Sequence, residues 1–213
     1  MVVVKTAREL SKMKDACRIS AEALRSYIEK QGAVPSFLGY GGFPASACIS
    51  VNNVVIHGIP SKELVLKEGD IVSVDVGAFY GGFHGDNAFT FPCGKISADA
   101  QALLDATKES LYEGIKQALA FNRVGDIGNA VQKYVEARSY SVVRAFVGHG
   151  VGAKLHEDPS VPNYGTAHRG VRLIPGMTIA IEPMVNQGRC NVRVLDDKWT
   201  TVTADGKLSA HFE

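Results

Sequence analysis

The sequence has little of what several large classes of protein depend on. Its 23 basic and 22 acidic residues leave a formal net charge of +1, so no long-range field favours nucleic acid or an anionic membrane as a partner. No apolar run approaches the length of a membrane span, and the opening MVVVKTAREL lacks the apolar core and cleavage site of a signal peptide. We therefore expect a cytoplasmic protein with no direct contact to nucleic acid or membrane.

The chain also lacks the signatures of a disulfide framework and of three common chemistries. Its four cysteines, Cys17, Cys48, Cys93 and Cys190, are far apart and form no C-x-x-C pair, which favours free thiols. The glycines of GHGVGAKLH are followed by histidine and acid rather than by a dinucleotide-binding helix. The sequence contains no Walker-type lysine loop and no serine in a nucleophile elbow. Dinucleotide, phosphate-loop and serine chemistry are therefore disfavoured.

What the chain does contain is an alternation of strand pairs and helices. Helical periodicity predicts helices over residues 6–30, 99–120 and 126–138. No linker rich in proline, glycine or serine divides the 213 residues. We therefore predict an α+β protein with a single domain over residues 1–213.

The stretch from Gly69 to Phe91 is predicted to form two strands joined by a glycine-rich turn. Alternation in its first arm is typical of a strand with both faces partly covered, so Asp75 is predicted to point inward among valines. A turn centred on Tyr80 and Gly81 would place Asp75 directly opposite Asp86, where two like charges repel. The pair therefore requires a proton, an arginine or a metal ion.

Three histidines stand at positions where a site could form. A strand over residues 48–58 delivers His57 just before a glycine, and His149 lies between glycines with His156 seven residues later. Glycines on both sides allow another backbone to approach closely. A lone histidine at a strand end is more often a hydrogen-bonded polar residue than a catalyst, so each needs further support.

Two more acids occur in apolar surroundings. A predicted strand over residues 172–185 carries Glu182 among isoleucines and methionine, where a carboxylate is costly without a partner. After a predicted Asp-Gly hairpin at residues 204–206, Glu213 shares its parity with Ser209 and His211. Glu213 is thus a third strand-borne acid.

A short internal repeat links the two acid-bearing regions. Gly69 precedes Asp75 by the same spacing as Gly176 precedes Glu182, with a hydrophobic strand between them in both cases. The match hints at two related halves that each present a carboxylate.

Together these acids and His149 form a set of oxygen ligands with one imidazole. Such a set suits one or two first-row divalent ions and hydrolysis by a metal-activated water. Residue by residue, other interpretations stay open: Asp86 as a turn former, Asp75 paired with an arginine, and the histidines as hydrogen-bonded core residues. Phe37, Tyr40 and Phe43 likewise either line a pocket or pack a loop against the core, and on their own packing is favoured.

Five segments in this order resemble the type I methionine aminopeptidases, in their short bacterial form, over Gly32 to Glu213. The matching segments are LGYGGFPASACISVNNVVIHGIP, GDIVSVDVGAFYGGFHGDNAFTF, GHGVGAKLHEDP, PGMTIAIEPM and LSAHFE. The resemblance implies a pita-bread fold of two pseudo-symmetric halves, with antiparallel sheet covered by helices. It also implies a metal-dependent aminopeptidase that removes N-terminal methionine from nascent proteins and peptides.

The resemblance assigns roles to individual residues. It implies catalytic roles for His57, His156 and Glu182, and it implies two divalent ions, Co, Mn, Fe or Zn, held by Asp75, Asp86, His149, Glu182 and Glu213. It implies a substrate pocket formed by Phe37, Tyr40, Phe43, Cys48, His57, His156 and Trp199. A monovalent cation is expected near Asn52, Val54 and Ser209. The expected partners are peptide and nascent-chain N-termini and the ribosome, and the expected state is a monomer.

Two departures from the family pattern keep alternatives open. The region before Gly32 is shorter than is usual in the family, and the sequence stops at Glu213 where relatives continue. The first alternative is therefore a catalytically weak or inert peptide-binding module of the same fold. The second is an X-Pro dipeptidase of the wider fold family, which the short N-terminal part and the aromatic loop disfavour.

Overall fold

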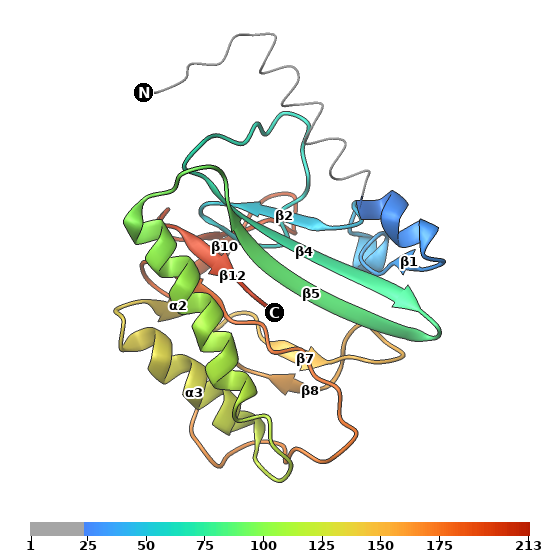
Figure 1. Cartoon of the computed structure of the whole chain (residues 1–213), viewed down its shortest axis with the longest axis vertical. Coiled ribbons are helices and arrows are strands. Elements are labelled where there is room, and N and C mark those ends of the chain that lie inside the picture. Colours follow the sequence, from blue (N-terminus) through green and yellow to red (C-terminus); the bar gives the residue numbers. More distant parts are fainter. Residues whose placement is uncertain (1–23) are drawn as a thin grey trace.

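The computed structural model describes residues 24–213 (Figure 1). Residues 24–30 are helical, in agreement with the end of the helix predicted over 6–30. The rest of that prediction, together with Cys17, lies outside the described residues. No helix in the described part of the chain is long and apolar enough to cross a membrane.

Besides the helical residues 24–30, the described chain contains the helices α2 and α3, a short 3-10 helix, two long strands and many short strands (Figure 1). In order they are β1 Val34–Pro35, η1 Tyr40–Gly42, β2 Cys48–Val51, β3 Val54–Ile56, β4 Ile71–Tyr80, β5 Phe83–Pro92, α2 Ala98–Ile115, α3 Val124–Glu136, β6 Ser141–Val142, β7 Gly148–Gly150, β8 Glu157–Val161, β9 Met184–Asn186, β10 Val192–Val194, β11 Thr201–Thr203 and β12 Ser209–His211. Strand pairs and helices alternate, as predicted.

The predicted hairpin is present as β4 and β5, but its predicted register is wrong. Asp75 pairs with Ala88 and Asp86 pairs with Gly77, because the turn is formed by Gly81 and Gly82. Both turn glycines have positive φ, 59° and 91°, which suits the two-residue turns of hairpins. The two acids are therefore diagonal rather than opposed. They still share one face, because the shift keeps the parity of the pairing.

Helices α2 and α3 begin where side chains satisfy free backbone N–H groups. The Ser97 hydroxyl accepts from the Ala100 N–H at 3.1 Å and so caps α2. At the start of α3, the Asp126 carboxylate accepts from the Arg123 N–H at 2.8 Å. Helix α2 ends five residues before the predicted Ala120; beyond its end, the Asn122 amide donates to the Gln117 carbonyl at 2.9 Å.

The main core lies between these helices and the sheet ordered β12-β9-β6. The two helices run side by side on one side of the molecule in Figure 1. Their buried side chains meet strand residues in one apolar cluster, which includes Leu103, Leu104, Leu111, Ile127, Val131, Val135, Val142, Val185, Ala210 and Phe212. The helices therefore support the strands that approach the site from the C-terminal half of the chain.

Three strand predictions in the shorter segments are wrong. Residues 48–58 form two strands, because Asn52, with φ of 56°, turns the chain so that β2 pairs with β4 while β3 pairs with β11. The segment before β9 is not a strand, so Glu182 lies on irregular backbone. The turn at residues 204–206 joins no hairpin, because β11 pairs with β10 and β3 whereas β12 pairs with β9.

The last residues of the chain run beside β5 and so join the two halves. The Thr90 hydroxyl donates to the His211 carbonyl at 2.7 Å and accepts from the His211 N–H at 2.9 Å. Further along, the Glu213 N–H donates to the Ala88 carbonyl at 2.9 Å. Glu213 is thereby held next to the acid-bearing face of the hairpin.

Candidate metal centre

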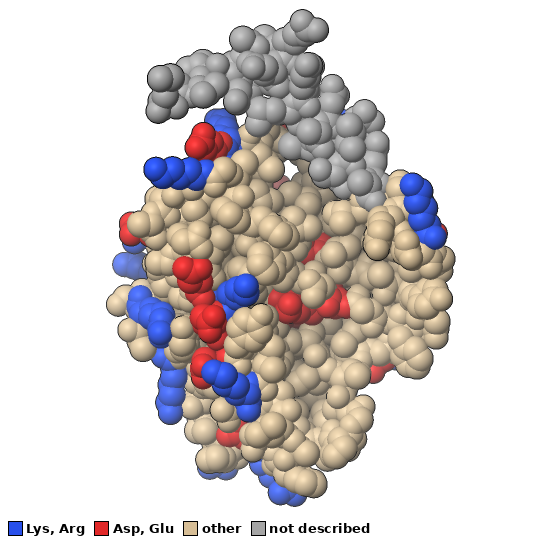
Figure 2. All heavy atoms as spheres, viewed as in Figure 1, with Lys and Arg blue, Asp and Glu red and all other residues tan. Residues whose placement is uncertain are grey.

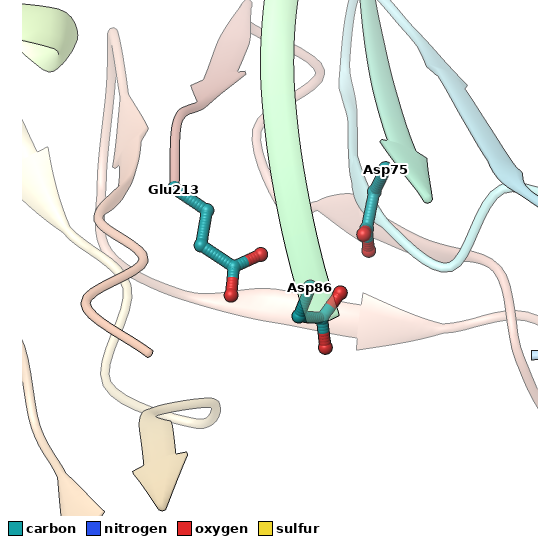
Figure 3. Close-up of side chains that lie close together, drawn as sticks. All are labelled: Asp75, Asp86 and Glu213. Atoms are coloured by element: carbon teal, nitrogen blue, oxygen red, sulfur yellow. The ribbon is translucent and has the colours of Figure 1, made fainter. Parts of the chain in front are cut away.

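Three carboxylates converge from the two halves of the molecule. Asp75 comes from β4, Asp86 from β5 and Glu213 from the segment after β12 (Figure 3). One oxygen of each lies within 4.8 Å of the others. In Figure 2, acidic side chains gather in a hollow at the middle of the face, near the C-terminus marked in Figure 1.

Burial makes this trio of carboxylates costly to ionise. It raises the pKa of Asp75 to about 8, the pKa of Asp86 to about 6 and the pKa of Glu213 to about 10, and the neighbouring acids add to each rise. Asp75 Oδ1 is buried and has no hydrogen-bond partner among the described residues. Such shifts indicate that a positive charge would be strongly favoured here.

His149 presents a bare nitrogen to the same acids. Its Nδ1 lies 2.8 Å from the Gly150 carbonyl, which can only accept, so Nδ1 carries the hydrogen. The other nitrogen, Nε2, lies 3.8 Å from Asp86 Oδ2 and 3.5 Å from Glu182 Oε1. In the neutral ring this nitrogen carries no hydrogen, and its lone pair faces carboxylate oxygens. This is the arrangement of a metal ligand.

The donor set therefore fits divalent metal ions. Among the described residues that line the cavity here, none is a lysine or an arginine, so the predicted alternative of an arginine partner for Asp75 is not met there. Four carboxylates and one imidazole match the preferences of first-row divalent ions.

Glycines bring the chain close enough to form this site. A Cβ on Gly148 would lie 2.3 Å from the Ala180 carbonyl oxygen, and one on Gly150 would lie 2.3 Å from that of Asp158. The Ala180 N–H in turn donates to the His149 carbonyl at 2.7 Å. This close approach, predicted from the flanking glycines, sets the segment that carries Glu182 against His149.

An apolar cavity of about 170 Å³ opens onto the acids. All residues predicted for the metal, catalytic and substrate-binding roles line it: Phe37, Tyr40, Phe43, Cys48, His57, Asp75, Asp86, His149, His156, Glu182, Trp199 and Glu213. Phe37, Phe43, Cys48 and Leu155 are buried together in its wall, with Trp199 packed against them. The loop aromatics thus form a pocket as well as a packed cluster.

The cavity wall includes one close glycine contact and an inert thiol. A Cβ on Gly77 would lie 2.7 Å from Phe37 Cε1, so only glycine lets this ring approach β4 so closely. Burial, reinforced by Asp75, raises the pKa of the Cys48 thiol well above its usual range. Cys48 therefore acts as a small apolar wall residue rather than as a nucleophile.

Two histidines stand at the boundary between the cavity and the acids. His57 packs edge-on to Phe146 and Trp199, and burial lowers its pKa to about 4. The His156 ring lies 4.2 Å from that of His149, between centroids. Its Nδ1 is 2.7 Å from the Tyr40 hydroxyl, so Tyr40 orients this imidazole in addition to lining the cavity.

Sequence reasoning missed five residues of the site region. Ile56, Phe146, Val147 and Leu155 line the cavity, and no spacing in the sequence distinguishes them from ordinary core residues. His211 lies behind it, 2 % exposed, with Nε2 at 3.6 Å from Glu182 Oε2. Its shared parity with Glu213 was the available signal. Burial opposes the charged form, but Glu182 and Asp75 outweigh it, so the pKa of His211 is raised.

The residues predicted to hold a monovalent cation lie near one another. The Ser209 N–H donates to the Asn52 carbonyl at 2.9 Å, and the Asn52 side chain donates to Asp70 at 2.8 Å. The Ser209 hydroxyl lies 2.9 Å from Asn186 Oδ1 and 3.3 Å from the Val185 carbonyl. Val54 opens the neighbouring strand β3. The cation itself stays a prediction.

Known proteins match this chain in both sequence and fold. Residues 2–204 match metallopeptidase family M24. A methionine aminopeptidase 1 of Bacillus subtilis is 50% identical over 100% of this chain and 94% of its own length, and one of Clostridium perfringens is 51% identical over 100% and 93%. A crystal structure of the Thermotoga maritima methionine aminopeptidase covers 100% of this chain and 93% of its own, with a TM-score of 0.85 at 45% identity.

The fold and the carboxylate centre define a metallopeptidase, and the chain belongs to metallopeptidase family M24. Within that family it is of the methionine aminopeptidase type, in the short bacterial form, as its motifs predicted. The predicted pita-bread fold is confirmed. A prolidase from Pyrococcus furiosus shares only the fold, with 20% identity and a TM-score of 0.62.

Proposed function

We propose that the protein removes the N-terminal methionine of nascent proteins and peptides, and that residues 1–213 act as a single metallopeptidase domain. One observation carries the proposal: a largely apolar pocket of about 170 Å³ ends at a cluster of buried acids. A pocket of this kind holds one apolar side chain, and the acids lie where the bond next to that residue would be cut.

Asp75, Asp86, His149, Glu182 and Glu213 would hold two divalent ions. When bound, these ions supply an activated water and polarise the scissile carbonyl. The chain's own part is to fix the ligand orientation and to keep the site apolar on its substrate side. Co, Mn, Fe and Zn all suit the donor set, and anomalous scattering at this site would identify the metal.

The apolar end of the cavity would bind the methionine side chain. Phe43 and Trp199 meet edge to face with centroids 5.2 Å apart, and Cys48 and Leu155 are almost fully buried beside them. A flexible thioether packs well against aromatic rings and sulfur. The apolar walls would disfavour a charged side chain, which would lose its hydration there without gaining a partner.

His57, His156 and Glu182 would act on the substrate directly. We assign to His156 a hydrogen bond to the oxygen that becomes negative, with the Tyr40 hydroxyl holding its Nδ1. His57 would hold the nitrogen of the departing amine. Glu182 would take a proton from the attacking water on one of its carboxylate oxygens and pass it to that nitrogen.

Several finer predictions belong to the same proposal. Free thiols at Cys48 and Cys190 support a reducing compartment such as the cytoplasm. A monomeric state, contact with the ribosome and a monovalent cation at Asn52, Val54 and Ser209 are further predictions. The five-ligand set argues against an inert binding module.

Peptide hydrolysis tests the proposal. Methionine release from a Met-Ala peptide should exceed release from a Met-Lys peptide, should stop after chelation and should return with added Mn²⁺. Hydrolysis of X-Pro substrates in preference to both would instead support the dipeptidase, and release that survives thorough chelation would refute the metal mechanism.

A further inference from the structure

Two buried polar side chains that the proposed mechanism does not use converge on Glu182. Asn163 is 0 % exposed and His211 is 2 % exposed. Each has one polar atom without a hydrogen-bond partner among the described residues, Oδ1 in Asn163 and Nε2 in His211. Neither residue lines the substrate cavity. Buried polar groups of this kind are costly and call for an explanation.

His211 faces the carboxylate of Glu182. Its Nε2 is 3.6 Å from Oε2, while His149 Nε2 is 3.5 Å from the other oxygen, Oε1. The carboxylate thus lies between two imidazoles, one on each oxygen. The main chain of His211 is fixed independently by the Thr90 hydroxyl and by pairing with Met184, so the ring has a defined position.

Asn163 holds the main chain at the same residue. Its Nδ2 donates to the Glu182 carbonyl at 2.9 Å. Glu182 lies on irregular backbone before β9 and is followed by Pro183, which has no N–H. The Asn163 amide therefore supplies a hydrogen bond to the main chain of Glu182, as the neighbouring strand does for the main chain of Asp75 in the hairpin.

We propose that His211 and Asn163 are positioning residues for Glu182, with His211 orienting its carboxylate and Asn163 fixing its backbone. The inference rests on the proposed function, in which Glu182 binds metal and moves a proton. Groups behind a metal ligand set its orientation, and losing one costs roughly 10–100-fold in metal affinity or activity.

The test compares His211→Leu, His211→Gln and Asn163→Ala with the control Asn122→Ala. Asn122 also donates an amide hydrogen bond of 2.9 Å to a backbone carbonyl, but it lies between α2 and α3 and does not line the cavity. Mn²⁺ affinity of the chelator-treated full chain is measured by calorimetry, and kcat and KM are measured on a Met-Ala peptide. Thermal unfolding shows which variants fold.

We expect His211→Leu and Asn163→Ala to lower Mn²⁺ affinity and kcat by about 10-fold or more with KM little changed. His211→Gln, which keeps a donor near the position of Nε2, should recover most of the loss, and Asn122→Ala should keep both values. Equal losses of Mn²⁺ affinity and kcat in His211→Leu and His211→Gln would overturn the proposal. Unchanged Mn²⁺ affinity in both His211→Leu and Asn163→Ala would overturn it as well. Should wild type release no methionine, the proposed function fails, yet the affinity comparison still decides the positioning roles.

Discussion

The two halves of the molecule supply their metal-site residues in different ways. The hairpin β4–β5 presents Asp75 and Asp86 from neighbouring positions of one continuous ladder. The C-terminal half supplies His149, Glu182 and Glu213 from three separate segments, which are held by scattered contacts such as the hydrogen bonds of Ala180 to His149 and of Glu213 to Ala88. The hairpin side is thus built locally, whereas the other side exists only when the tertiary structure is complete.

Removing one ligand from each half is expected to give the largest effect. Asp75→Asn and Glu213→Gln should each lower kcat/KM by more than about 100-fold, because both remove a carboxylate that holds the ions. Thermal unfolding with and without Mn²⁺ sharpens the comparison, since stabilisation by the metal should be lost in both. Retention of full metal-dependent stabilisation in either variant would contradict its assignment as a ligand.

Glycine substitutions test whether the C-terminal half is the less tolerant side. Gly77→Ala in β4 meets two side chains, Phe37 at 2.7 Å and Ser36 at 2.8 Å, while Gly150→Ala in β7 meets the backbone oxygen of Asp158 at 2.3 Å. Side chains can shift more readily than a main chain, so we expect about 1–3 kcal/mol for Gly77→Ala and more for Gly150→Ala. Urea unfolding measures both. A larger loss in Gly77→Ala would reverse the comparison.

Trp199→Ala should act on binding more than on chemistry. The indole contacts the Phe43 and His57 rings, and its loss opens the apolar end of the cavity. KM for a Met-Ala peptide should rise by about 10-fold with a smaller change in kcat. Trp199→Phe, which keeps an aromatic edge, serves as the control. A fall in kcat at constant KM would place Trp199 in the chemical step instead.

The smallest effect concerns Asp126 at the start of α3, which does not line the cavity. Asp126 accepts hydrogen bonds from the Arg123 and His168 N–H groups, and these lower its pKa. Asp126→Ala should cost about 1 kcal/mol at pH 7. A lowered pKa stabilises the fold above the carboxyl's unfolded pKa, so the difference from wild type should shrink as the pH falls below about 4. A difference that persists at pH 2 would exclude an ionic cap. Methionine release should be unchanged.

The contrast between the locally built hairpin and the C-terminal half also explains which features the sequence could predict. Alternation sufficed to place Asp75 and Asp86 on one face of a hairpin, because strand parity is a local property. It was wrong about their register, because the turn was assigned one residue early. For Glu182, apolar neighbours indicated a strand, yet tertiary contacts with His149 and Asn163 hold that segment as irregular backbone.

The residues that sequence reasoning missed are those whose role depends on distant partners. Leu155 and Phe146 resemble ordinary core residues until the fold brings them to the cavity. The predicted hairpin at residues 204–206 failed for the same reason: its turn residues are correct, but β12 pairs with β9 instead of β11. Short motifs were enough to predict the metal ligands. The elements that hold those ligands in place depend on pairing between strands far apart in the sequence, which the motifs do not reveal.

The contact of β5 with the segment around His211 and Glu213 has a consequence for folding kinetics. Residues 86 and 213 meet only after the intervening chain has folded between them, so closing this contact carries a high contact order. A folding intermediate that holds only the hairpin would present half of the ligand set and bind the ions weakly. Uptake of metal during refolding would therefore report the last tertiary step rather than early collapse.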